Sequence, residues 1–361
     1  MSEGGGGGVH ASVSGERPRR RRNAERDKPV IVPDPPAHSS FEFGFCEDRN
    51  APRRRKMEVR RGRRGACRWI LSGRRTLPQD SHAFFYDFGG VKDQGFFAVY
   101  DGHGGKSAAA WCGEHFHELL LKNLTPSDPA HAEGEAKSGE FIVPVLEVLD
   151  QTFAEADSYL NGAHGIFSGC TAIVALYRHE MRESQEGQAE EEEEEEDEDE
   201  GGHKDGDGNC STTPVLYTAN VGDSRAVLLR GKRAVRLSYD HKGSDVIEQQ
   251  RVKESGGFIM NDRVNGMLAI TRALGDAEMK DFIAGRPYTT ETVLRPGEDQ
   301  LLILACDGLW DVCSDQEACE LIRDEEDPSE AAHRLVEYAI AHGSFDNLSV
   351  LVIRFRQPPP A

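Results

Sequence analysis

Short apolar runs alternate along the chain with stretches in which apolar residues recur every three or four positions. The runs are rich in Val, Ile, Phe and Leu, which predicts β-strands at 82–88, 95–100, 169–177, 215–221, 225–230, 300–306 and 348–355. The second pattern predicts amphipathic helices around 112–120, 146–160 and 332–340. The last helix has a suitable N-cap in Asp327, Pro328 in its first turn and Gly343 after its end. This pattern predicts a core that mixes strands and helices.

Charge separates the 361-residue chain into a basic arm and an acidic body. Residues 1–75 contain 19 Lys and Arg against 9 Asp and Glu, whereas the remainder contains 24 against 54. The first 40 residues and 49–64 are low-complexity and basic, and eleven consecutive acids occupy 190–200. Such segments cannot bury enough apolar surface to offset the entropy of ordering them. We therefore expect one domain at 74–356 with an acidic disordered insert at about 178–213, a basic, largely disordered arm at 1–73, and a Pro-rich tail at 357–361.

Membrane and nucleic-acid functions are disfavoured. No window approaches the roughly 18 consecutive apolar residues of a membrane span, and we expect no secretory signal, because the start lacks a basic segment followed by an apolar one. An acidic body would repel a nucleic-acid backbone, so we expect no nucleic-acid partner. The arginines at 19–22 leave open both a nuclear import signal and a plain solvated tail.

The eight cysteines form no Cys-x-x-Cys pair. Cys112 and Cys306 stand in apolar surroundings, which predicts buried, reduced thiols. Reduced thiols are typical of the cytoplasm and the nucleus. We therefore expect a protein of the cytoplasm, the nucleus or both, and we expect it to be a monomer.

Four of the apolar runs end or begin at an aspartate: Asp101, Asp223, Asp307 and Asp346. Rigid strands deliver such side chains to one edge of a sheet, and the glycines beside them allow close approach of the backbone to an ion. Clustered aspartates without Cys or His pairs indicate Mg²⁺ or Mn²⁺ rather than Zn²⁺. An Asp-Gly pair is also ordinary turn chemistry, but four strand-end aspartates favour a metal site.

Eight short motifs follow one another in a fixed order: DGHGG at 101–105, SGCTA at 168–172, GDSRA at 222–226, DHK at 240–242, RVNG at 263–266, RALGD at 272–276, ACDG at 305–308 and DN at 346–347. With these motifs the chain resembles the metal-dependent type 2C protein phosphatases over about 74–356, apart from the acidic insert. The stretch 268–355 is particularly similar to the small fungal members of the family, which restrain stress-activated MAP kinase cascades.

The resemblance implies an α+β fold, a β-sandwich of two antiparallel sheets flanked by antiparallel helices. It also implies two ions, Mn²⁺ or Mg²⁺, at one end of the sandwich. Asp101 would bridge both ions and Gly102 would offer its carbonyl to one of them. Asp307 and Asp346 would complete the shell of the second ion. Two further positions match those that hold an additional, weaker metal in some relatives, namely Asp223 and Asp311.

The resemblance also implies three catalytic positions. Asp80 would act through metal-bound water, and Arg75 has the spacing of the arginine that binds the substrate phosphate, with Arg74 as the alternative. His103 is the natural proton donor for the departing Ser or Thr alkoxide. Gln79 stands where the family usually has Glu, so we expect weaker metal affinity without loss of activity.

The sequence thus predicts a serine/threonine phosphatase that hydrolyses phosphoserine and phosphothreonine in proteins by attack of a water activated by two metal ions. Phosphoproteins are the expected partners, with MAP kinases and their stress pathways as candidates. A cysteine-dependent phosphatase is excluded, because no cysteine has an arginine six residues later. The alternative is a catalytically weak pseudophosphatase that binds phosphoproteins as a scaffold. The complete set of expected ligands favours the enzyme.

Overall fold

The computed structural model describes Val30 and residues 32–48, 79–125, 144–161, 166–182 and 212–356. Most of the expected basic arm, the run of eleven acids, the Pro-rich tail, Arg74 and Arg75 therefore lie outside the described residues. The described residues from Val32 onwards belong to one compact unit. Within these ranges, no helix has both the length and the apolar composition needed to cross a membrane.

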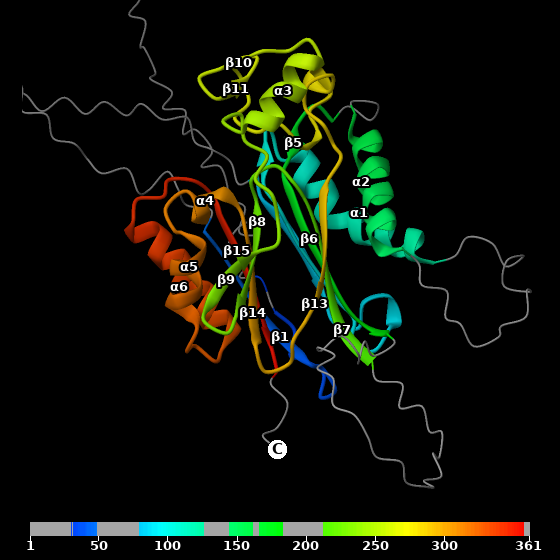
Figure 1. The fold of residues 1–361 in the computed structure, drawn as a ribbon, viewed down its shortest axis with the longest axis vertical. Helices are drawn as coiled ribbons and strands as arrows, with labels where there is room; N and C mark the ends of the chain where they lie inside the picture. The colour runs from blue at the N-terminus through cyan, green and yellow to red at the C-terminus, as the bar shows by residue number, and fades with distance from the viewer. Residues whose placement is uncertain are drawn as a thin grey trace, which may run out of the picture. The chain divides into compact units, whose positions relative to one another are not determined.

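Two five-stranded antiparallel sheets form the centre of this unit (Figure 1). In spatial order, the first sheet contains β13 (Tyr288–Val293), β7 (Thr212–Val221), β6 (Ala172–Met181), β3 (Gly95–Tyr100) and β2 (Ser81–Phe85). The second contains β1 (Phe41–Asp48), β15 (Leu348–Phe355), β14 (Asp299–Ala305), β8 (Arg225–Arg230) and β9 (Arg233–Arg236). The expected α+β sandwich of two antiparallel sheets is confirmed.

The sheets are covered on both faces, which explains why their central strands read as continuous apolar runs. In β3, Phe96 and Tyr100 belong to the apolar cluster beneath the helices. Phe97, which directly follows Phe96, points to the other face of the sheet, where its ring contacts those of Phe41 and Phe43 in the second sheet. All five rings are buried.

Helices cover the outer face of each sheet, on opposite sides of the sandwich in Figure 1. The first sheet packs against α1 (Ser107–Leu124) and α2 (Val145–Leu160). The second packs against α4 (Asp307–Trp310), α5 (Asp315–Ile322) and α6 (Pro328–Ala341). The predicted signals of the last helix are confirmed. The Asp327 side chain accepts a hydrogen bond from the N–H of Ser329 at 2.7 Å, and Pro328 opens the first turn.

Smaller elements surround the end of the sandwich that carries the strand-end aspartates. A three-stranded sheet consists of β4 (Gly102–His103), β5 (Gly169–Cys170) and β12 (Leu274–Gly275). A separate lobe contains α3 (Val246–Glu254) and the hairpin of β10 (Ile259–Met260) and β11 (Arg263–Val264), with a small apolar cluster of its own. Two 3₁₀ turns complete the elements of the described ranges, at Phe88–Gly90 and Ala277–Met279.

The predicted strands agree with the observed ones to within a few residues, except at the acidic insert, in polar elements and at 169–177. This last stretch is divided between β5 and β6, which belong to different sheets. Pairing of β6 with β7 continues to Met181 and Thr212, so the expected edges of the insert at 178–181 and 212–213 are strand. The pattern misses β13, because this edge strand is largely Thr and Glu and has no apolar run. It also misses α3, which carries few apolar side chains.

The expected arm at 1–73 is wrong over 41–48, because this segment forms β1. It pairs with β15 along its whole length, from Phe41 opposite Phe355 to Asp48 opposite Leu348. Apolar and other residues alternate in it, so that its phenylalanines point into the sandwich. Gly44 lets α6 lie close behind the strand, since a Cβ there would come within 2.1 Å of the backbone nitrogen of Ser329. Average composition hides this short strand among arginines and glycines.

Candidate active site

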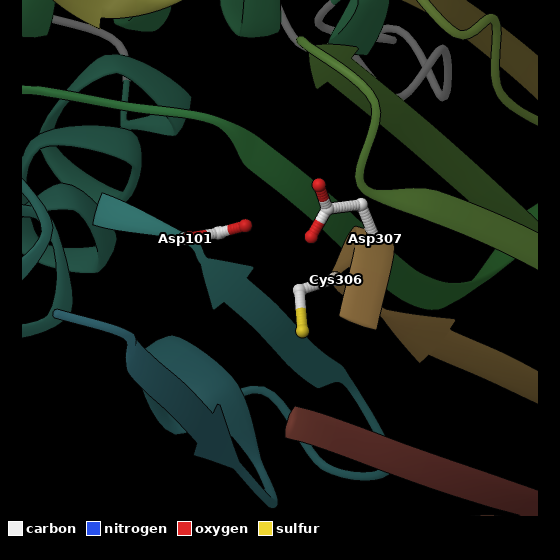
Figure 2. Close-up of side chains that lie close together, drawn as sticks. All are labelled: Asp101, Cys306 and Asp307. Atoms are coloured by element: carbon white, nitrogen blue, oxygen red, sulfur yellow. The ribbon is translucent and has the colours of Figure 1, made fainter. Parts of the chain in front are cut away.

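Aspartates from both sheets meet at one end of the sandwich. Asp101 directly follows β3 of the first sheet, and Asp307 follows β14 of the second, with Cys306 between strand and aspartate. Figure 2 shows the two carboxylates pointing toward each other, and one ligand atom from each of these three side chains lies within 4.8 Å of the others. The rigid strand ends therefore produce the proximity that the sequence predicts.

Asp80 and Asp346 stand beside this pair. Asp80 lies just before β2, and its Oδ2 accepts a hydrogen bond from the hydroxyl of Ser349 at 2.8 Å. Asp346 lies just before β15, where its Oδ1 accepts the N–H of Asn347 at 2.8 Å. Its negative charge contributes to the raised pKa values of the other carboxylates of the cluster. Four acidic side chains from four separate chain segments thus share one small region.

The electrostatics of this cluster fit divalent cations. Burial, followed by the charges of neighbouring carboxylates, raises the pKa values of Asp101 and Asp307 well above the usual range. Burial also raises the pKa of Asp80 to about 6, against the opposing effect of the Ser349 hydrogen bond. The Oδ1 atoms of Asp80 and Asp307 are buried without a hydrogen-bond partner among the described residues. Carboxylate oxygens in this state suit a hard cation such as Mn²⁺ or Mg²⁺.

Cys306 lies in the cluster but is a poor ligand. Its Sγ accepts a hydrogen bond from the N–H of Ser349 at 3.3 Å and donates to the carbonyl of Asn347 at 3.4 Å. Burial and the nearby aspartates raise the pKa of this thiol well above its usual range, which disfavours the thiolate. A metal needs the thiolate. The site therefore offers oxygen ligands, and the predicted buried, reduced Cys306 and Cys112 are confirmed.

Gly102 directly follows Asp101, is the first residue of β4 and is buried. A Cβ at this position would lie 2.5 Å from the backbone oxygen of Gln79. Only glycine therefore allows the segment before Asp80 to lie against the segment after Asp101. The expected role of the Gly102 carbonyl as a metal ligand stays a prediction.

Asp223 and Asp311, the expected residues of a further metal, are joined by a cationic side chain. The Nζ of Lys242 lies 3.6 Å from Oδ2 of Asp223 and 3.3 Å from Oδ1 of Asp311. Burial raises the pKa of Asp223 above its usual value, although the positive charge of Lys242 partly offsets this effect. Lys242 belongs to the DHK motif at 240–242, but the sequence does not predict a role for it in the site. A lysine two residues after a motif aspartate gives no sign of the distant carboxylates that it contacts.

His103 lies in β4 at the edge of the cluster, where its ring contacts Asp276. The Nε2 atom is 2.8 Å from Oδ1 and 2.7 Å from Oδ2 of this carboxylate. Asp276 closes the RALGD motif, but the sequence reasoning gave it no role. Arg75 lies outside the described residues, so its binding of the substrate phosphate stays a prediction.

Comparison of the sequence with known proteins identifies the family of this chain. The family model described as protein phosphatase 2C matches residues 70–348. The chain belongs to the protein phosphatase 2C family. Protein phosphatase 2C homolog 1 of Schizosaccharomyces pombe is 38% identical over 332 residues, which are 92% of this chain and 78% of that protein. Its namesake in Saccharomyces cerevisiae is 38% identical over 321 residues, or 89% of this chain and 96% of that one.

Solved structures agree on the fold of this phosphatase. The serine-threonine phosphatase 2C of Toxoplasma gondii has a TM-score of 0.60 at 18% identity and covers 90% of this chain and 98% of that one. A sex determining protein of C. elegans has a TM-score of 0.60 at 24% identity, with 89% and 66% coverage. Protein phosphatases 2C are metal-dependent protein serine/threonine phosphatases, and this chain is one of them.

Proposed function

We propose that this phosphatase hydrolyses phosphoserine and phosphothreonine in proteins by direct attack of water, with two divalent cations, Mn²⁺ or Mg²⁺, in the aspartate cluster. The observation that carries the proposal is the convergence of mutually repelling carboxylates from both sheets, of which Asp101 and Asp307 are half-buried. Asp101, Gly102, Asp307 and Asp346 would hold the cations. When bound, two such ions lower the pKa of a water and neutralise charge on the phosphate.

The other polar groups have separate tasks in this proposal. Asp80, held by Ser349, would orient the attacking water. The guanidinium of Arg75 would bind the phosphate oxygens in a bidentate manner. His103 would donate the proton that the Ser or Thr oxygen needs to leave, because an alkoxide is a poor leaving group. Asp223 and Asp311 would share their negative charge between Lys242 and a further, weakly bound cation.

We place the substrates among phosphoproteins of a stress-activated MAP kinase cascade. The similarity of 268–355 to small fungal members supports this assignment, as does the identity to two yeast proteins over most of their length. We further propose a monomer in the cytoplasm, the nucleus or both. The free thiols among the described cysteines agree with such a reducing compartment.

The test is hydrolysis of a phosphothreonine peptide with Mn²⁺, with and without EDTA. Wild type should turn over with Mn²⁺ and stop with EDTA, and Asp307→Asn should reduce turnover to near the EDTA level. The control is Asp324→Asn, which changes an exposed aspartate in the loop after α5. It should match wild type. Binding of the peptide without turnover in Mn²⁺ would instead establish the pseudophosphatase. Equal turnover of Asp307→Asn and wild type would contradict the proposed site.

A further inference from the structure

His103 and Asp276 form a partly buried pair from segments 173 residues apart in the chain. The side chain of Asp276 is only 9% exposed and that of His103 is 24% exposed. Both carboxylate oxygens lie within 2.8 Å of the same ring nitrogen, Nε2. We propose that Asp276 is a positioning residue for His103, holding Nε2 so that Nδ1 is the nitrogen that delivers the proton to the leaving group. This inference rests on the proposed function.

The small three-stranded sheet brings the two residues together. Gly169 of β5 pairs with His103 of β4 on one side and with Gly275 of β12 on the other. Asp276 follows Gly275 directly and has a φ of 56°. Aspartate and asparagine tolerate this left-handed conformation better than most other side chains. The backbone therefore turns at the residue whose carboxylate contacts the histidine on the far side of Gly169.

Gly169 provides the space through which this contact is made. A Cβ on Gly169 would lie 2.3 Å from Oδ2 and 2.5 Å from Oδ1 of Asp276. Any other residue would displace the carboxylate from the ring of His103. The glycine of the SGCTA motif thus acts on the histidine of the DGHGG motif through the aspartate of the RALGD motif.

The loop that carries Asp276 is held from outside the site. Oδ1 of Asp157 in α2 accepts the N–H of Gly275 at 2.9 Å and the ammonium of Lys280 at 2.6 Å. Lys280 also donates to the carbonyl of Gly275 at 2.9 Å. These contacts fix the backbone next to Asp276 without touching His103. Asp276 is therefore preorganised, as a residue that orients a proton donor must be.

The carboxylate of Asp276 determines which ring nitrogen of His103 can serve the substrate. A carboxylate accepts only, so Nε2 is the donor in this contact and the other ring nitrogen is left for the substrate. When the bond from phosphorus to the Ser or Thr oxygen breaks, a bond from phosphorus to the water oxygen forms. The Nδ1 proton goes to the departing oxygen, a proton of the attacking water is lost to solvent, and His103 regains its proton from solvent. The Nε2 proton stays on the ring throughout, in its hydrogen bond to Asp276.

The decisive comparison uses two leaving groups. Asp276→Asn keeps the volume and the tolerance of a left-handed backbone but replaces one acceptor oxygen with an amide donor. We expect kcat on a phosphothreonine peptide to fall by about 10- to 100-fold, which is part of the roughly 100- to 10,000-fold that general acid catalysis usually contributes, with KM little changed. With p-nitrophenyl phosphate kcat should fall by less than about threefold, because nitrophenolate leaves without a proton. Equal losses on both substrates would overturn the inference.

A double-mutant cycle separates positioning from general damage. If Asp276 acts through His103, Asp276→Asn should have no further effect on phosphothreonine turnover in a His103→Gln background. Additive effects would contradict the inference. Gly169→Ala should reproduce the selective loss with Asp276 still present, and this variant serves if Asp276→Asn fails to fold. Nitrogen NMR of the wild-type protein should show the neutral ring protonated at Nε2, and protonation at Nδ1 would also overturn the inference.

Asp150→Asn is the matched control, because it is the same change on α2 at an exposed ion pair with Arg286 that touches neither Asp276 nor His103. It should leave the ratio of kcat on the two substrates as in wild type. A ratio that shifts as much as in Asp276→Asn would show that the effect is not specific to the contact with His103 and would defeat the inference. Failure of the wild type on the phosphothreonine peptide would instead defeat the proposed function and this inference with it.

Discussion

The side-chain oxygen of Gln79 accepts a hydrogen bond from the backbone N–H of Gly105 at 3.0 Å. This contact ties the segment before Asp80 to the end of the DGHGG motif. An amide oxygen and a carboxylate oxygen can both accept this bond. The usual family glutamate would therefore fit the same geometry and differ mainly by its negative charge.

We expect Gln79→Glu to strengthen metal binding. The added charge lies beside the aspartate cluster, where it favours cations while keeping the hydrogen bond to Gly105. The Mn²⁺ concentration for half-maximal turnover should fall by about tenfold, in the range usual for groups next to metal ligands. A Mn²⁺ titration of turnover measures this, with Gln79→Met, which removes the acceptor, expected to shift the other way. Unchanged metal dependence in Gln79→Glu would contradict the prediction.

Lys242 should compete with a further cation for Asp223 and Asp311. Its ammonium lies within 3.6 Å of both carboxylates and supplies positive charge where that cation would bind. Lys242→Met should therefore raise the affinity for an additional Mn²⁺ by roughly tenfold, whereas Lys242→Arg should not. Calorimetry or electron paramagnetic resonance of Mn²⁺ counts the bound ions directly. Identical binding isotherms for Lys242→Met and wild type would show that the lysine does not compete.

Phe43 should make a large contribution to stability, although it lies ahead of the basic stretch. Its ring is 2% exposed and contacts the rings of Phe84, Tyr86 and Phe97. Phe43→Ala should lower the free energy of unfolding by about 3 to 5 kcal/mol, as for other buried aromatics. Denaturant unfolding tests this. Glu42→Ala, on the neighbouring position with an exposed ion pair, should cost less than about 1 kcal/mol, and equal effects would argue against the buried strand.

Glu248 should anchor the lobe that contains α3. Burial raises its pKa, but hydrogen bonds and charge from Arg272, with help from Arg251, outweigh burial and hold the pKa at about 2. The ionised form is thus favoured by folding. Its contribution to stability is complete above pH 4.5, the ordinary value for glutamate, and is lost as the pH falls toward 2.

Glu248→Gln should lower the free energy of unfolding at pH 7 by about 3 kcal/mol, because it leaves the guanidinium of Arg272 without its buried negative charge. As the pH falls from 4.5 toward 2, the free energy of unfolding of the variant should also decline less steeply than that of wild type. Chemical unfolding at several pH values measures both quantities. Glu254→Gln, on an exposed position of the same helix, is the control. A variant with wild-type stability and pH slope would refute the anchoring role.

The sequence predicts the parts of the molecule in which one local rule decides the outcome. Apolar runs such as 300–306 predict central strands because both faces of the sheet are buried. Asp101 and Asp307 are predictable because a strand end determines where the next side chain lies. β13 is missed because an edge strand needs no apolar run, and β1 because its three phenylalanines are too few to change the composition of the arm.

Contacts between distant segments are beyond the reach of sequence patterns. The pairing of Asp276 with His103 depends on Gly169 standing between β4 and β12, so three separate motifs must be placed before the contact exists. Lys242 likewise joins carboxylates that follow different strands. Each motif alone indicates a turn or a strand end. Their chemistry follows from the sheet that aligns them.

The aspartate cluster lies on the seam between the two sheets, and this has a consequence for how the protein matures. Asp80 and Asp101 flank strands of the first sheet, whereas Asp307 and Asp346 flank strands of the second. Neither sheet alone supplies all four of these carboxylates. If the cluster holds two cations as proposed, its metal site is complete only once the two sheets have packed together, so activity would come only with the finished sandwich.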